Sequence, residues 1–441
     1  MGEICYKNFK FKDNNNIYKE NEEEKSMNEI GMIDKICNLL NETTDDEEIV
    51  NVLKLLNEKF KNKQNEILYQ YFMDFDIFGL LISFLNSENI RICHLGFMTI
   101  INFTRTNEDF VQMFLENGLL IIIHNIIKNP ETNIFLLTES ISILLNILKF
   151  NDIYLRRCFF VLPLERLFNY VKLNDIDLTR VCIKYSVNIL QNSKMVGRNL
   201  KIIEFFSYVL SSDILKNDVI IEYVIYGITI YTKSSDFSSS QLLKLDIPKQ
   251  LIDLLQNPEK LYILQLLRLF GLLIIKKVIK TLDFHLMLPY LNSNNSNVQS
   301  EGYWSLSCAI IENIITDKTE LINFFLNSIN ECKCFDVTVE SSHAIISLLK
   351  LLNDDEMILF LKNDIFNLLS RFLFLTSYPS IIIDVLKIIF KYYDIITKNG
   401  NKELIYQKLE NSNCIQQIQE LCFNEDENIS TLAKSLQKFL L

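Results

Sequence analysis

The sequence predicts an all-α protein built of stacked helical repeats, and three observations support this prediction. The 441-residue chain has only 10 Gly and 6 Pro, too few for the turns that a strand-rich fold requires. Amphipathic helical patterns run almost without interruption from about residue 30 to Leu441. One helical phrase also recurs along the chain at a nearly constant interval. Because this length exceeds what a single globular core usually holds, we expect an elongated architecture.

The chain divides by composition into a short polar segment and a long helical one. Residues 1–29 are rich in charged and polar side chains, which predicts a disordered tail. Residues 30–441 carry the helical patterns, with short Asn-rich connections such as residues 292–297. Since Gly is scarce, we expect Asn to supply the turns and the helix caps.

The recurring phrase has a polar or acidic start, a bulky position, and Asn or its substitute four residues later. Its end positions are Asn102, Asn146, Asn188, Ile230, Leu272, Cys308, Ser347 and Lys391. The intervals between them are 44, 42, 42, 42, 36, 39 and 44 residues. A period near 42 residues in a purely helical chain is typical of HEAT and armadillo repeats. We therefore predict a right-handed superhelical solenoid of about nine or ten three-helix repeats, with a long concave surface.

Composition also limits the classes of ligand and activity that we expect of the chain. The 44 Lys and Arg against 55 Asp and Glu give a net charge of −11, which argues against nucleic acid and anionic lipid and favours a basic partner. No uncharged apolar run reaches the roughly 18 residues of a membrane span. The chain lacks a Gly-rich phosphate loop, a nucleophile elbow and a His-Glu-x-x-His motif, so we expect neither enzymatic activity nor a cofactor.

Cysteine and histidine patterns predict no metal site. The ten Cys are scattered without a ligand-like spacing, as expected for reduced core thiols. Cys332 and Cys334 form the only close pair, and the four His are isolated from any Cys or acidic cluster.

Several motifs, in a common order, resemble those of one family. The segment Glu301-Gly-Tyr-Trp-Ser-Leu-Ser-Cys308 is similar to a Glu-Ala-x-Trp-x-Ile-Ser-Asn phrase of importin-α. Residues 266–271, Leu-Leu-Arg-Leu-Phe-Gly, resemble its Ala-Leu-Arg-x-Val-Gly phrase, and Leu178-Thr-Arg180 its Met-Thr-Arg. Residues 403–440 are similar to its closing repeat. The chain thus resembles, over residues 28–441, the armadillo adaptor that carries nuclear localisation signals.

The resemblance implies that a basic peptide lies extended along the concave groove. In the family, Asn side chains pair with peptide units, Trp rings hold the stems of Lys and Arg, and carboxylates meet their charged ends. Carried over, the groove residues are Asn102, Asn146, Asn188, Arg268, Glu301, Trp304 and Glu340. The resemblance further implies basic cargo, importin-β and nucleoporins as partners, and a location in cytoplasm and nucleus.

The chain departs from the family at several of these positions. The Trp positions beside the first three Asn are Met98, Ser142 and Lys184. The key acidic position is Phe150, with Asp152 close by. In the second half of the groove the substitutes are Leu272, Cys308, Ser347 and, for one Trp, His343. Residues 1–29 contain no Arg, unlike the basic segment with which importin-α binds importin-β.

Two functions therefore remain open. The first is an importin-α-like adaptor for basic localisation signals, in which the Asn series, Glu301, Trp304 and Glu340 contact the peptide. The alternative is an armadillo scaffold that has lost signal binding and holds another protein; Trp304 is then a core residue and the glutamates are solvated helix starts. An acidic concave face favours the adaptor, and an apolar or mixed face favours the scaffold.

Overall fold

The computed structural model describes residues 31, 34–60, 77–150, 152–192, 199–212, 217–328, 335–398 and 402–440. Within these ranges the regular structure is helical, apart from one isolated bridge between Leu282 and Ile315. This confirms the all-α prediction. The chain divides into two compact units, Met1–Asn192 and Ser193–Leu441. The predicted tail, residues 1–29, lies outside the described residues.

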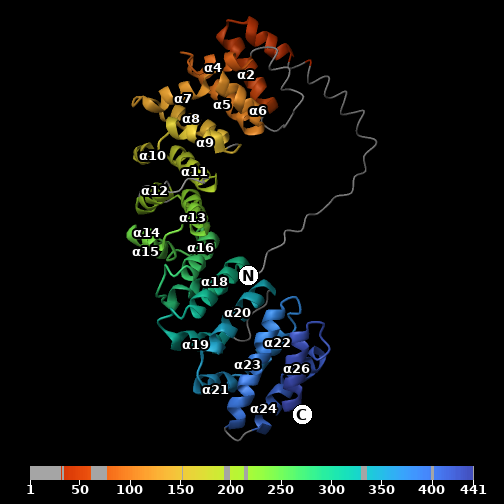
Figure 1. Ribbon diagram of the computed structural model, residues 1–441. Coiled ribbons are helices and arrows are strands. Elements are labelled where there is room, and N and C mark those ends of the chain that lie inside the picture. The colour runs from red at the N-terminus through yellow and green to blue at the C-terminus, as the bar shows by residue number, and fades with distance from the viewer. Residues whose placement is uncertain are drawn as a thin grey trace, which may run out of the picture. The chain divides into compact units, whose positions relative to one another are not determined.

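The first unit is built of helices that recur in the order short, short, long (Figure 1). A helix at residues 34–42 comes first. The labelled helices that follow are α2 (Asp46–Phe60), α4 (Ile77–Phe84), α5 (Ile90–Thr106), α6 (Glu108–Glu116), α7 (Leu119–Lys128), α8 (Ile134–Ile147), α9 (Asp152–Val161), α10 (Leu164–Val171) and α11 (Ile176–Asn192).

The second unit repeats this order in four groups, whereas α12–α13 and α19–α20 are groups of two helices among the described residues. Its first helices are α12 (Asn199–Ser211), α13 (Asp218–Lys233), α14 (Ser239–Lys244), α15 (Ile247–Leu254), α16 (Ile263–Ile275), the 3-10 turn η2 (Phe284–Leu286), α17 (Leu288–Leu291) and α18 (Ser296–Ile311). The remaining ones are α19 (Lys318–Ser328), α20 (Phe335–Leu351), α21 (Asp354–Lys362), α22 (Ile365–Leu373), α23 (Pro379–Lys398), α24 (Lys402–Asn411), α25 (Cys414–Leu421) and α26 (Glu427–Leu440).

The last helix of each group carries the recurring phrase, and we call these the third helices. They are α2, α5, α8 and α11 in the first unit, and α13, α16, α18, α20, α23 and α26 in the second. Within each unit, every third helix packs against the next one along the chain. This is the three-helix stacking of an armadillo-type solenoid, in which no repeat can bury its apolar face alone. The predicted period is confirmed.

Asn replaces Gly at helix ends, as predicted. The side chains of Asn89, Asn133 and Asn217 accept hydrogen bonds from the first backbone N–H groups of α5, α8 and α13. Asn174, Asn313 and Asn413 have positive φ angles of 60°, 53° and 62°. Asn tolerates this left-handed conformation better than other residues with a side chain, because its short amide can bond locally. The chain therefore turns without the glycines that it lacks.

The core of the first unit is aromatic where α4, α5 and α6 meet. Phe78 and Phe103 both pack against Phe110 and Phe114, with ring centroids 5.0 to 6.2 Å apart. All four side chains are buried. Edge-on contacts of this kind add to the free energy gained from burial alone.

The described cysteines are core residues. Cys37, Cys93, Cys158, Cys182, Cys308, Cys414 and Cys422 are buried and form no disulfide. Burial raises the pKa of Cys158 to about 12, so such thiols stay protonated and unreactive. The close pair at positions 332 and 334 lies outside the described residues.

In the described part of the chain, no single helix is both long and apolar enough to cross a membrane. The pair α6 and α7 reaches that length and hydropathy only together, and it is bent by 73°.

Candidate interaction faces on the third helices

The predicted Asn residues of the first unit connect neighbouring third helices. Nδ2 of Asn102 on α5 donates a hydrogen bond to Oδ1 of Asn57 on α2 at 2.9 Å. Nδ2 of Asn146 on α8 donates to the Ile101 carbonyl at 3.0 Å and to the Thr104 hydroxyl at 3.2 Å on α5. Both Asn side chains are 6% exposed. Their amide donors thus satisfy groups of the preceding repeat, which gives these residues a structural role.

Asn57 extends this series by one repeat and was missed by the sequence analysis. It precedes Asn102 by 45 residues, so the spacing could have revealed it. Its Nδ2 bonds to the Leu95 carbonyl at 3.2 Å and to the Thr99 hydroxyl at 2.9 Å on α5. The third predicted member, Asn188, bonds instead within its own helix, to the Lys184 carbonyl at 3.1 Å. The structure therefore joins Asn57, Asn102 and Asn146 across repeats, but not Asn188.

Positive charge gathers around the end of this series. Nζ of Lys149 donates to Oδ1 of Asn146 at 3.2 Å. Burial lowers the pKa of Lys149, and the nearby charges of Arg105 and Lys184 lower it further. The three cations come from α5, α11 and the turn after α8, and we call them the cationic face of the first unit. A group of positive charges such as this one repels a Lys-rich ligand.

The positions that hold Trp and an acid in the family carry other side chains here. Met98 and Ser142 are half-buried, and the Ser142 hydroxyl bonds back to the Thr138 carbonyl at 2.8 Å. Phe150 is half-buried in the turn after α8. The side chain of Asp152 lies outside the described residues. Phe150 is thus the one described aromatic ring at these positions, and none of them has a described carboxylate.

In the second unit, the structure brings together four predicted residues on α16, α18 and α20. We call Arg268, Glu301, Trp304 and Glu340 the acidic face of the second unit. Nη2 of Arg268 forms an ion pair with Oε1 of Glu301 at 2.8 Å. One turn further on α18, the Ser305 hydroxyl donates to the Leu267 carbonyl at 2.7 Å and is fully buried. These two contacts fix α18 against α16.

Trp304 lies against a glycine of the preceding third helix. A side-chain carbon added to Gly271 would lie 2.3 Å from Cζ3 of Trp304, much closer than two carbons can approach. Trp304 is half-buried. The indole is therefore held over the α16 backbone and keeps part of its surface in contact with solvent.

Glu340 is half-buried, and one oxygen of its carboxyl group is enclosed by the protein. Its Oε2 atom is buried and has no hydrogen-bond partner among the described residues. Burial raises the pKa of Glu340, and the charges of Glu301 and Asp336 act in the same direction. Together they bring it from 4.5 to about 7. Burial also raises the pKa of Glu301, while Arg268 lowers it. A cation from a partner would stabilise both carboxylates.

The substituted positions of the second unit supply little further polarity to this face. Leu272 and Ser347 are half-buried, and Cys308 is buried. Burial lowers the pKa of His343, and Lys350 lowers it too, whereas Asp384 acts in the opposite direction. His343 is therefore a neutral side chain beside the acidic face at neutral pH.

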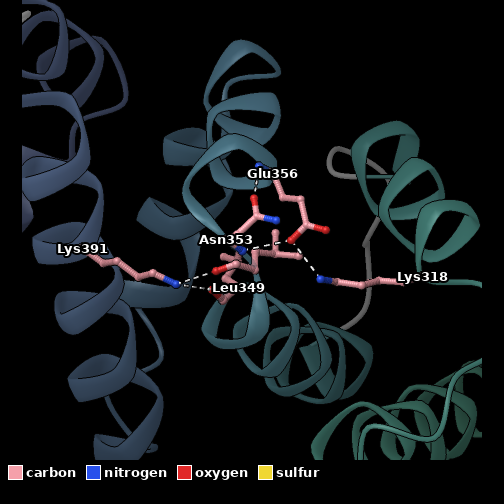
Figure 2. A network of polar contacts seen from close by, with 6 residues as sticks. Lys318, Leu349, Asn353, Glu356 and Lys391 are labelled. Carbon is pink, nitrogen blue, oxygen red and sulfur yellow. Dashed lines mark hydrogen bonds and ion pairs between the residues drawn. The ribbon is translucent and has the colours of Figure 1, made fainter. Parts of the chain in front are cut away.

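Lys391 lies on α23 at the end position of the recurring phrase. Like Asn102 and Asn146, it bonds to the preceding third helix (Figure 2). Its Nζ atom donates to the carbonyls of Leu349 at 3.3 Å and Leu352 at 2.9 Å, at the end of α20. A cation here also meets the negative end of the α20 dipole. The position thus connects third helices even where Asn is lost.

A capping box lies at the start of α21, in the turn that follows α20. Asn353 and Glu356 bond to each other's backbone N–H groups at the start of α21, and Lys318 reaches Glu356 at 2.8 Å (Figure 2). Although partial burial acts to raise it, the pKa of Glu356 is lowered by the hydrogen bonds from Lys318 and Asn353.

The comparisons with known proteins concern the fold. No protein-family model matches the chain, and no curated protein does. Among solved structures, an engineered protein (Northeast Structural Genomics Consortium target OR497) aligns over 92% of this chain and 98% of its own, with a TM-score of 0.66 and 13% identity. At that identity the likeness is one of helical repeat architecture alone.

Designed armadillo repeat proteins also align, less closely. One, YIII(Dq)4CqI, covers 62% of this chain and 98% of its own, with a TM-score of 0.42 and 14% identity. Another, solved in complex with the peptide (KR)4, covers 62% and 98%, with a TM-score of 0.43 and 13% identity.

Substituting Asn146 by Ala should destabilise the first unit. The change leaves the Ile101 carbonyl and the Thr104 hydroxyl without this donor, which costs about 1–3 kcal/mol of unfolding free energy. Urea denaturation followed by circular dichroism measures it. Asn125→Ala, at an exposed position of α7, is the control. Equal midpoints for the two variants would contradict the structural role.

Gly271→Ala should displace the indole of Trp304. Because the chain has a single Trp, its fluorescence reports this residue directly. The added methyl group forces the ring outward, so we expect an emission maximum shifted to longer wavelength and a lower unfolding midpoint. An unchanged emission maximum in a folded variant would mean that Trp304 does not lie over Gly271.

Glu340 should make stability depend on pH. The folded chain keeps its proton up to about pH 7, whereas the unfolded chain loses it near the ordinary pKa of 4.5. Its contribution to stability is therefore complete below pH 4.5 and is lost as pH rises through 7. Allowing for partial solvation, Glu340→Gln should gain on the order of 1 kcal/mol over wild type between pH 5 and pH 8.

Urea denaturation at both pH values measures this difference. Glu259→Gln, at an exposed position, is the control. A Gln variant whose advantage is the same at pH 5 and pH 8 would contradict the buried state of Glu340.

Proposed function

We propose that the chain is a protein-interaction scaffold that binds an extended segment of a partner along its third helices. The observation that carries this proposal is the acidic face of the second unit. There the half-buried Trp304 follows Glu301 by one turn on α18, and Glu340 lies on the neighbouring third helix α20. No catalytic step is part of the proposal.

The chemistry of this face suits a Lys or Arg side chain. The apolar stem can cover the exposed part of Trp304, where the ring also attracts the positive charge. The charged end can then compensate Glu340, whose buried oxygen has no partner. Burying a carboxylate is costly unless a cation accompanies it, so the partner's charge should lower the pKa of Glu340.

The cationic face of the first unit favours the scaffold over an adaptor for Lys-rich signals. Lys184 and Lys149 repel such a peptide at the positions where the resemblance places its main contacts. Nδ2 of Asn102 already donates one hydrogen bond to the preceding repeat, and Nδ2 of Asn146 donates two. The first unit thus carries a group of three cations, whereas the face of the second unit carries two carboxyl groups and one Arg.

The narrower proposal is an importin-α-like adaptor for nuclear import. The residues Arg268, Glu301, Trp304 and Glu340 support it, because they match the family's motifs and form one face. In this version the cargo signal binds the second unit, and importin-β, nucleoporins and a location in cytoplasm and nucleus follow from the resemblance alone.

A fluorescein-labelled octapeptide of alternating Lys and Arg should bind more tightly at pH 8 than at pH 6. Glu340 ionises between these values, so affinity should rise about three- to tenfold. Fluorescence anisotropy at low salt measures it. Glu340→Gln should remove the pH dependence, and Trp304→Leu should weaken binding at both pH values.

Glu259→Gln serves as the matched control and should bind as wild type does. Absence of binding at low salt, by a chain that circular dichroism shows to be folded, would contradict the acidic face as a site for cations. Binding that is strong but indifferent to Glu340 and Trp304 would place the site elsewhere.

A further inference from the structure

An open groove lies between α7 and α9 in the first unit, away from the third-helix phrase. It has a volume of about 410 Å³. Leu120, Ile121 and His124 of α7 line one side, and Arg156, Arg157 and Phe160 of α9 line the other. None of these residues belongs to either charged face described above.

The groove exposes large apolar side chains to solvent. Phe160 is 78% exposed and Ile121 is 69% exposed. Folding contributes little burial free energy for such side chains, whereas a bound partner that covers each one would gain about 1.5–3 kcal/mol. Contiguous exposed apolar surface of this kind marks interaction sites.

The Phe160 ring is held in place although it is exposed. It stacks on His124, with ring centroids 5.5 Å apart and planes inclined by 17°. Because a ring that is fixed beforehand loses little conformational entropy on binding, Phe160 is suited to anchor a partner.

Two arginines give the groove its charge. Arg156 and Arg157 are exposed, and neither makes an ion pair in the described part of the chain. They precede Phe160 by four and three residues, so all three lie on one side of α9. The net charge of the chain is −11, which makes this cationic rim a local exception and not a general property of the surface.

We propose that the α7–α9 groove binds a short amphipathic helix of a partner protein, with bulky apolar side chains on one face and Asp or Glu beside them. The apolar side chains cover Phe160 and Ile121, and the carboxylates pair with Arg156 and Arg157. This site is separate from the proposed third-helix faces, so a test of one proposal does not decide the other.

The probe is a fluorescein-labelled helical peptide of about 16 residues, composed of Leu, Phe, Glu and Ala with Leu and Phe on one face. Its binding to the full chain is measured by fluorescence anisotropy. We expect saturable binding that Phe160→Ser weakens at least tenfold. The double variant Arg156→Glu, Arg157→Glu should weaken it by a similar factor. Both changes are at exposed positions, so folding should persist.

Phe423→Ser is the matched control, because Phe423 is 89% exposed on another part of the chain. This variant should bind the peptide as wild type does. A matching peptide with Lys in place of Glu should bind at least tenfold more weakly. Equal binding of the two peptides, or equal binding by the Phe160 and Phe423 variants, would overturn the proposal.

Two further measurements distinguish a partner helix in the groove from a second copy of the chain and from a membrane surface. Sedimentation that shows a dimer dissociating with Phe160→Ser would assign the groove to a second copy of the chain and overturn the proposal. Vesicles of phosphatidylserine that bind wild type but not Phe160→Ser, without any peptide binding, would assign it to a membrane surface and overturn it as well.

Discussion

Each repeat of this chain depends on the contact between its third helix and the third helix of the preceding repeat. The long third helices carry a large share of the buried apolar side chains, and each one needs its neighbour to cover them. Polar groups at these contacts set the register: the buried Asn102 bonds to Asn57, the buried Ser305 to Leu267, and the half-buried Lys391 to the end of α20. Such groups are costly to bury without partners, so only one register satisfies them.

The same contact determines what the faces can bind. Where α18 packs on α16, Gly271 leaves room for the indole of Trp304, and Arg268 neutralises Glu301. No equivalent cation pairs with Glu340 among the described residues, so its pKa rises. In the first unit Lys184 takes the position that corresponds to Trp304, and Lys149 lies near both Lys184 and Arg105. The third helices thus pack against one another in both units. The residue types on these helices determine the charge of each face.

Much of the fold could be predicted from the sequence, because a period of about 42 residues and Asn at helix ends are local patterns. The position of Glu301 beside Trp304 followed from helical spacing alone. The cationic face could not be foreseen, since Lys149 and Arg105 meet only after α5 and α8 pack together. For the same reason, the sequence could not show that the amides of Asn102 and Asn146 are used between repeats. The α7–α9 groove depends equally on packing, because its two sides come from helices of different repeats.

The central claim is that a partner segment binds on the third helices. The first and second helices of each repeat, which we call the outer helices, are not part of the site. Hydrogen–deuterium exchange of the full chain, with and without a saturating octapeptide of alternating Lys and Arg, tests it most directly. The account predicts slower exchange in α18 and α20 on peptide binding, with exchange in the outer helices α15 and α22 unchanged. Protection confined to outer helices, or no protection at peptide concentrations that saturate anisotropy, would contradict it.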